Sequence, residues 1–159
     1  MVGGSVAHLF FLVKVGPDGT VYACYSDDHN VYVKYSTNKG LSWSEPIQIS
    51  QGPETKTAVF PAITTGPVPG TIGVAWYGST KDSTGDDSAD WYVFYSLVTD
   101  VKGTPVLHQA RASDHVIHGA NISENGLVVG GQSPNRNLAD YFQIAFDPTG
   151  AVVIAYADD

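Results

Sequence analysis

A five-residue pattern occurs twice in this chain, as YVKYS at residues 32–36 and as YVFYS at residues 92–96. In both copies, neighbouring side chains alternate in the way that is typical of a strand with two different faces. Each copy follows an apolar run, a turn rich in Pro and Gly, and a β-branched run. This order predicts an antiparallel hairpin in front of each pentapeptide.

The hairpin pattern occurs a third time near residue 159. Its turns are GPDG from residue 16, GPVPG from residue 66 and DPTG from residue 147, and an aromatic residue follows the last glycine of each turn by six positions. These aromatic residues are Tyr25, Trp76 and Tyr156. A fourth strand is predicted at PIQIS from residue 46 and, more weakly, at VLHQARA from residue 106. The repeating unit is therefore four consecutive antiparallel strands.

The length of this unit indicates the fold. The two pentapeptides lie 60 residues apart, and about nine of those residues form an insertion around residues 82–90. The remaining period suits the ~40–50 residues of a β-propeller blade. We therefore predict an all-β chain of four-stranded antiparallel blades, with about two and a half blades present. The predicted parts are a first blade at 1–50, a second at 51–112, a long inter-blade loop at 113–138 and the first hairpin of a third blade at 139–159.

Two and a half blades cannot close a ring, because propellers protect their edges by closing with ~4–8 blades. The remaining blades could come from a longer polypeptide, from other copies of the chain, or from a partner that supplies the missing strands. We expect the first of these, because the sequence stops directly after the second strand of a blade.

Composition excludes several classes of partner. The chain has 16 acidic and 8 basic residues and a formal net charge of −8, so it offers no cationic surface for a nucleic acid or an anionic membrane. No apolar run approaches the ~20 residues that span a bilayer. Cys24 is the only cysteine, which excludes an internal disulfide and a thiolate-rich metal site.

An eight-residue motif begins at the end of the first pentapeptide. The segment STNKGLSW at residues 36–43 resembles the Asp-box, or BNR repeat, of sialidase-like propellers, whose pattern is Ser, any residue, Asp, any residue, Gly, any residue, Thr or Ser, Trp. The departure is an Asn in place of the Asp. We expect a structural turn, in which the Asn side chain caps backbone amides and the Gly adopts a positive φ. Its residues are Ser36, Asn38, Gly40, Ser42 and Trp43.

The resemblance covers most of the chain, because residues 60–80 and 136–159 also look like first hairpins of blades in secreted BNR-repeat proteins. The second blade has only a decayed box, SLVTDVKGT from residue 96. The resemblance implies a six-bladed ring and an extracellular or cell-surface location, although the start of the sequence does not read as a signal peptide.

The order of the strands sorts the loops onto two ends of the blades. Connections from second to third strand and between blades share one end, which is acidic and is where propellers of this family bind ligands. The candidate ligand residues on this end are Asp27, Asp28, His115, His118, Arg136, Asp140, Asp158 and Asp159.

A metal site is a weaker prediction. The carboxylates in the insertion could ligate Ca²⁺, but their spacing matches no defined calcium loop, so a solvated loop tip is the expected state and no other cofactor is expected. These residues are Asp82, Asp86, Asp87 and Asp90. The two histidines near Asp114 could likewise form a zinc or acid/base group, or simply form turns.

The arginine count bears on catalysis. A sialidase needs an arginine cluster for the substrate carboxylate, with a Tyr nucleophile, a Glu and an Asp acid/base, whereas this chain has only Arg111 and Arg136. We therefore expect a non-catalytic propeller module that binds a glycan or a protein. Two alternatives stay open. One is a part of a sialidase-type glycoside hydrolase whose other catalytic residues lie outside this chain, and the other is a structural subunit that assembles through open blade edges.

Overall fold

The structure is a computed structural model that describes residues 11–123, 135–138 and 141–159. These residues form strands β1 to β11 and one short 3-10 helix, η1 (Pro53–Thr55). All the strands pair antiparallel, in three sheets, so the prediction of an all-β chain with antiparallel sheets is confirmed. Within the described ranges no sheet closes on itself, and no helix is long and apolar enough to cross a membrane.

The first sheet contains β1 (Leu12–Val15), β2 (Val21–Ser26), β3 (Val31–Ser36) and β4 (Ile47–Gln48), which are hydrogen-bonded in chain order. The pentapeptide YVKYS lies in β3, and its Tyr32 lies directly opposite Tyr25 of β2. The turn between β1 and β2 uses Gly19 at a φ of 80°, a conformation that glycine adopts without a steric penalty.

The second sheet contains β5 (Thr57–Thr65), β6 (Ile72–Ser79), β7 (Asp90–Thr99) and β8 (Val106–Arg111), again in chain order. The pentapeptide YVFYS lies in β7. A further strand, β9 (His118–Gly119), pairs with the start of β7 through Trp91 and His118. β9 lies inside the segment predicted as a loop and is not predicted from the sequence, because a two-residue pairing leaves no alternating pattern.

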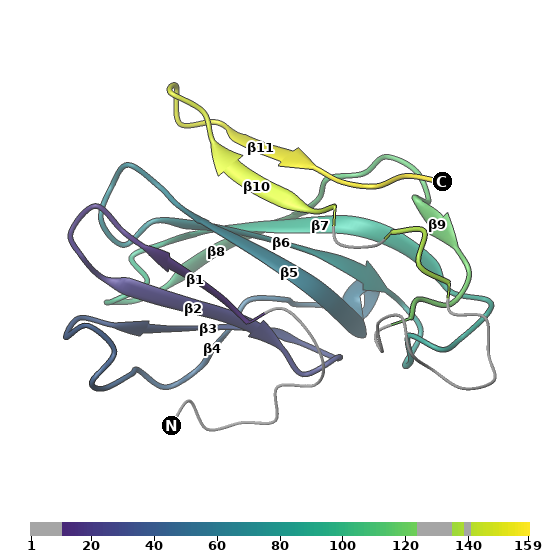
Figure 1. The fold of residues 1–159 in the computed structure, drawn as a ribbon, viewed down its shortest axis with the longest axis horizontal. Coiled ribbons are helices and arrows are strands. Elements are labelled where there is room, and N and C mark those ends of the chain that lie inside the picture. The colour runs from purple at the N-terminus through teal and green to yellow at the C-terminus, as the bar shows by residue number, and fades with distance from the viewer. Residues whose placement is uncertain (1–10, 124–134, 139–140) are drawn as a thin grey trace.

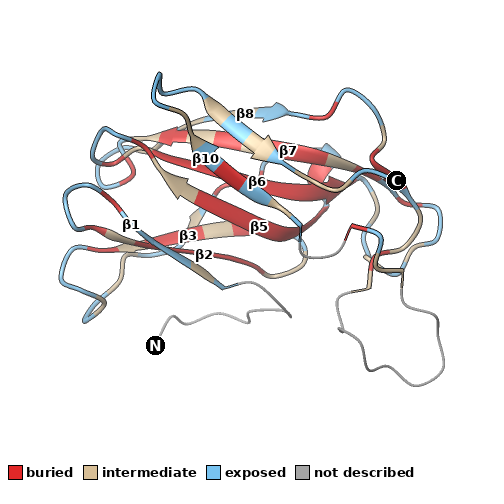
Figure 2. Cartoon of the chain, turned by 45° about the horizontal axis from the view of Figure 1, so that its top comes forward, coloured by how far each residue is buried: buried red, intermediate tan, exposed pale blue. Residues whose placement is uncertain are grey.

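The third sheet is the terminal hairpin, which consists of β10 (Gln143–Phe146) and β11 (Val152–Ala155). The second sheet lies between the first sheet and this hairpin (Figure 1), and β5 contacts both β1 and β10. Burial follows this order, because β5, β6 and β7 are mostly buried whereas β1 and the hairpin are partly exposed (Figure 2).

Alternate residues of the second strands form two buried interfaces. Between the first and second sheets, Tyr22 and Cys24 of β2 share a core with Val74 and Trp76 of β6. Their neighbours in β6 face the other way, toward the terminal hairpin, because successive strand side chains point to opposite faces of a sheet. Ala75 accordingly packs with Ile144 of β10, and Tyr77 packs with Ile154 and Tyr156. β6 thus uses one face for the first sheet and the other for the terminal hairpin.

Candidate functional site

The turn between β3 and β4 contains the residues that match the Asp-box. Asn38 Oδ1 accepts the Ser42 N–H at 2.9 Å and the Ser36 hydroxyl at 2.9 Å, and Asn38 Nδ2 donates to Ser42 Oγ at 2.7 Å. Ser36 Oγ in turn accepts the N–H of Gly40 at 2.9 Å, and Gly40 has a φ of 87°. Trp43 is half-buried beside Gly40. The polar groups of Asn38 and Ser36 therefore hold the turn itself.

Two other turns use the same bond. Asp100 Oδ2 accepts the Thr104 N–H at 2.9 Å, and Asp147 Oδ1 accepts the Ala151 N–H at 2.9 Å. In all three turns an Asn or Asp side chain thus accepts the amide four residues later. The decayed box in the second sheet keeps this cap although its glycine is displaced and it has no Trp.

The turns that join first to second strands meet at one end of the molecule. Pro17, Pro67 and Pro148 come from the three sheets, and all three line one open depression of about 470 Å³. The predicted ligand residues lie at the opposite end of the strands. Each hairpin strand has a first-to-second turn at one end and a second-to-third or inter-sheet connection at the other.

The candidate ligand residues fall into separate groups. Asp27 Oδ1 accepts the amides of His29 at 3.1 Å and Asn30 at 2.7 Å, so it caps the turn between β2 and β3. Asp28 has a φ of 76°, and its carbonyl accepts the N–H of Ala58 at 2.9 Å, which ties this turn to β5. Both aspartates therefore hold the backbone, while the two histidines lie after β8.

The imidazole of His115 lies between two carboxylates. Its Nδ1 is 2.6 Å from Asp114 Oδ1, and its Nε2 is 2.9 Å from Asp158 Oδ2. The hydrogen bond with Asp114, supported by Asp158, raises the pKa of His115 above its usual value, and the same bond lowers the pKa of Asp114. The His115 side chain is 52% exposed, so this triad is accessible to a ligand.

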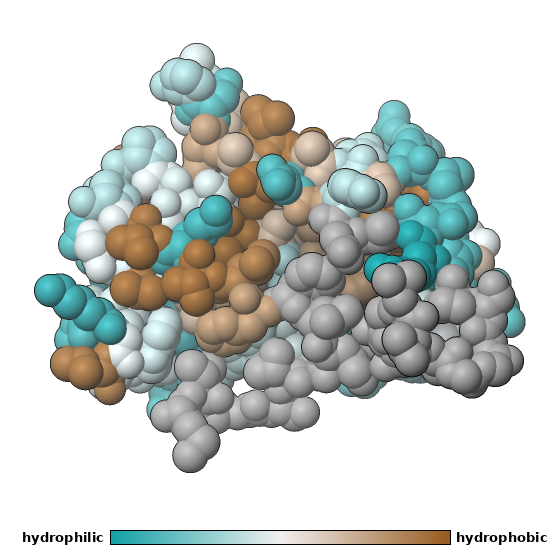
Figure 3. Space-filling view, viewed as in Figure 1, coloured by the Kyte–Doolittle hydropathy of each residue, from teal (hydrophilic) through white to brown (hydrophobic). Residues whose placement is uncertain are grey.

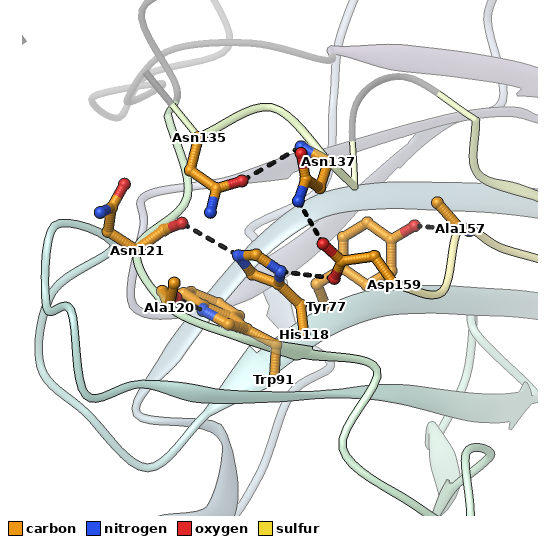
Figure 4. Close-up of polar contacts among 9 residues, drawn as sticks. All are labelled: Tyr77, Trp91, His118, Ala120, Asn121, Asn135, Asn137, Ala157 and Asp159. Carbon is orange, nitrogen blue, oxygen red and sulfur yellow. Dashed lines mark hydrogen bonds and ion pairs between the residues drawn. The ribbon is translucent and has the colours of Figure 1, made fainter. Parts of the chain in front are cut away.

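The imidazole of His118 is buried in a second polar cluster (Figure 4). Its Nδ1 lies 2.6 Å from Asp159 Oδ1, and its Nε2 lies 3.1 Å from the carbonyl of Asn121. Asn137 Nδ2 donates to the other carboxylate oxygen of Asp159. Burial raises the pKa of Asp159, but the hydrogen bonds from His118 and Asn137 outweigh it and leave the pKa below its usual value.

This second cluster joins three separate segments of the chain. Trp91 of β7 donates its indole N–H to the carbonyl of Ala120 at 2.8 Å, which fixes the segment after β9. The Tyr77 hydroxyl oxygen accepts the N–H of Ala157 at 3.4 Å, which fixes the segment after β11. Because His118 is buried and both ring nitrogens are engaged, it holds loops in place and does not face a ligand. Asn121 and Asn137 are not found from the sequence, because no local pattern marks an asparagine that serves a distant segment.

The arginines lie in different surroundings. The Arg111 guanidinium lies 4.6 Å from the centre of the Tyr92 ring, a cation–π contact between β8 and β7. Arg136 is half-buried in the segment 135–138, next to Asn137. Asp140, which the sequence predicts as a partner for this region, lies outside the described residues.

The four aspartates of the insertion have separate partners. Asp82 pairs with Lys56 at 3.5 Å. Asp86 accepts the Ser88 amide at 2.8 Å, and Asp87 accepts the Asn121 side-chain amide at 2.5 Å. Asp90 lies opposite Gly119 in the pairing of β7 with β9. Among the described residues, no group of three or more His, Cys, Asp or Glu side chains is arranged to hold a metal ion.

No protein-family model matches this sequence, and no curated protein matches it at a significant level.

Proposed function

We propose that this chain is a segment of a sialidase-like β-propeller that binds a glycan or a protein, at the cell surface or outside the cell, and that does not cleave glycosidic bonds. The observation that carries the proposal is the constant orientation of the three hairpins. In β2, the residues three and five positions after the turn glycine face the following sheet. In β6 and at the end of β11, the residues four and six positions after the turn glycine face the preceding sheet.

A constant orientation is what a ring of blades requires, because each blade must present one face to the blade before it and the other to the blade after it. The contacts of β5 with both β1 and β10 also fit this arrangement, since first strands lie innermost around a propeller channel. The three prolines around one depression would then mark one mouth of that channel.

The opposite mouth supplies the ligand groups. Asp114, His115 and Asp158 offer two carboxylates and an imidazole on an exposed surface. Carboxylates accept hydrogen bonds from sugar hydroxyls and attract basic side chains. The acidic surface disfavours an anionic sugar such as sialic acid, since like charges would lie together. We therefore expect a neutral glycan or a basic protein segment.

The arginines argue against catalysis by this chain. Arg111 is engaged by Tyr92 in the second sheet, and Arg136 is the only other arginine in the sequence. Two arginines in different surroundings do not make the cluster that a sialidase needs for its substrate carboxylate.

The test combines turnover and binding. The purified chain is incubated with a fluorogenic sialoside and is separately applied to immobilised neutral, sialylated and basic-peptide ligands. We expect no turnover, binding to a neutral glycan or a basic peptide, and weaker binding by His115→Ala. The matched control is His108→Ala, which removes an exposed histidine from β8. Turnover of the sialoside would contradict the proposal and would favour the hydrolase alternative.

A further inference from the structure

The segment after β9 contains the one place in the sequence where an asparagine is followed, two positions later, by a serine or threonine. This acceptor segment is Asn121-Ile122-Ser123. Asn, any residue except Pro, and then Ser or Thr is the pattern at which a glycan is attached to an asparagine side chain in secreted proteins. A pattern of three residues is short, so the surroundings of Asn121 decide whether it can act as an acceptor.

The acceptor segment lies outside the strands and presents its two functional side chains at the surface. Its middle residue, Ile122, is 4% exposed and packs in the same core as Trp91. The flanking residues Asn121 and Ser123 are only half-buried, and none of the three belongs to a strand. Figure 4 shows the Asn121 side chain pointing away from the His118 ring. The segment is therefore anchored by its centre, with the acceptor amide accessible on one side.

The backbone holds the acceptor segment in place. The N–H of Ile122 donates to the carbonyl of Thr84 at 2.8 Å. The N–H of Ser123 donates to the carbonyl of Asn135 at 2.9 Å. These main-chain bonds do not use the side-chain amide or the hydroxyl of the pattern, so a modification of the Asn121 side chain leaves them intact.

The one contact of the Asn121 side chain with the acidic insertion is compatible with a glycan. Asn121 Nδ2 donates to Asp87 Oδ1 at 2.5 Å. A primary carboxamide nitrogen has two hydrogens, and attachment of a sugar replaces one of them. The remaining N–H can still donate to Asp87, so the modification does not require this bond to be broken.

The surface around the acceptor segment is hydrophilic. Polar side chains gather at the end of the molecule where β9 lies, whereas apolar side chains gather along β1 and the terminal hairpin (Figure 3). The neighbouring insertion contributes the exposed carboxylates of Asp82 and Asp87. A glycan is bulky and solubilising, so this end of the molecule suits it better than the apolar side does.

We propose that Asn121 is the attachment site of an asparagine-linked glycan, donated by an oligosaccharide that is carried on a polyprenyl diphosphate. A bond forms between Asn121 Nδ2 and the anomeric carbon of the first sugar, and the bond between that carbon and the diphosphate oxygen breaks. The polyprenyl diphosphate leaves, and one amide proton passes to a base of the transferring enzyme. The proposal rests on the extracellular location in the proposed function and is independent of the ligand groups around His115.

The test uses the protein recovered from outside the cells that naturally make it. Trypsin cleavage after Arg111 and Arg136 releases residues 112–136 as one peptide, and mass spectrometry shows whether this peptide carries sugars. We expect a glycopeptide. Enzymatic removal of the glycan in heavy-oxygen water should then leave a labelled aspartate at Asn121 and not at Asn125, which lacks the pattern.

Matched variants separate the modification from the fold. Ser123→Ala removes the hydroxyl of the pattern but keeps Asn121 and its bond to Asp87, and it should abolish the mass increase of the intact protein. Ser123→Thr keeps the pattern and should retain the mass increase.

Three outcomes would overturn the proposal. Two of them concern this site alone, namely an unmodified Asn121 in the extracellular protein and a glycan that persists in Ser123→Ala. The third is protein found only inside the cell, which would overturn the extracellular location as well. Ligand binding is measured separately, so a failure of the ligand test leaves the result at Asn121 unchanged.

Discussion

Replacing Asn38 by alanine tests whether the turn between β3 and β4 is held by its side chains. The substitution removes three hydrogen bonds, two accepted by Oδ1 and one donated by Nδ2. Such bonds contribute about 0.5–1.5 kcal/mol each, and these three lie at an exposed or partly buried turn, so the lower half of that range applies. We expect a loss of about 1.5–3 kcal/mol, a clear fraction of the ~5–15 kcal/mol that stabilises a typical domain.

The assay is equilibrium unfolding in urea, followed by tryptophan fluorescence. The matched control is Thr37→Ala in the same turn, where no change beyond about 0.5 kcal/mol is expected for an exposed residue. Asn38→Asp should retain most of the stability, because a carboxylate oxygen can accept the same two bonds and Ser42 can turn its hydroxyl to donate. An Asn38→Ala variant as stable as the parent chain would refute the reasoning, since the turn would then be held by backbone conformation alone.

Three further outcomes follow from the packing and charges. Gly78→Ala should destabilise the chain by about 1–3 kcal/mol through a clash with Phe94, measured by thermal unfolding. His115 has a raised pKa in the folded chain, so its two carboxylate partners stabilise the fold at pH values below the usual His pKa, and this contribution is lost as pH rises through the raised pKa. The stability difference between the parent and His115→Gln should therefore be larger at pH 5.5 than at pH 8.5, and equal differences would contradict this. Finally, the hydrogen bond from the Lys102 ammonium, together with hydrogen bonds from Thr20, lowers the pKa of Asp18 to about 2. An NMR titration of Lys102→Ala should show a higher pKa that stays below 3.8, because the bonds from Thr20 remain.

The regular strands and turns can be predicted from the sequence because each depends on a local pattern of residues. Alternation in YVKYS and YVFYS, together with a Pro/Gly turn before each, is sufficient to predict β3 and β7 as third strands of antiparallel sheets. The turn caps are local as well, since each joins residues four positions apart. Asp100 shows that a cap survives when the surrounding motif does not, because the bond depends on one carboxylate and one amide rather than on the glycine position.

The candidate site can be predicted from the sequence only in part, because it depends on contacts between segments that are distant along the chain. His118 and Asp159 were both candidates, but nothing local indicates that they bind each other or that Asn137 joins them. The insertion shows the converse. Asp86 and Asp87 are adjacent in sequence, yet one caps its own turn and the other reaches Asn121, so closeness in sequence does not produce a shared metal site.

The most direct measurement for the central claim is an experimental structure of the protein at its natural length. The account predicts that β1, β5 and β10 lie innermost around one central channel. A structure in which the three sheets share no central axis would contradict it.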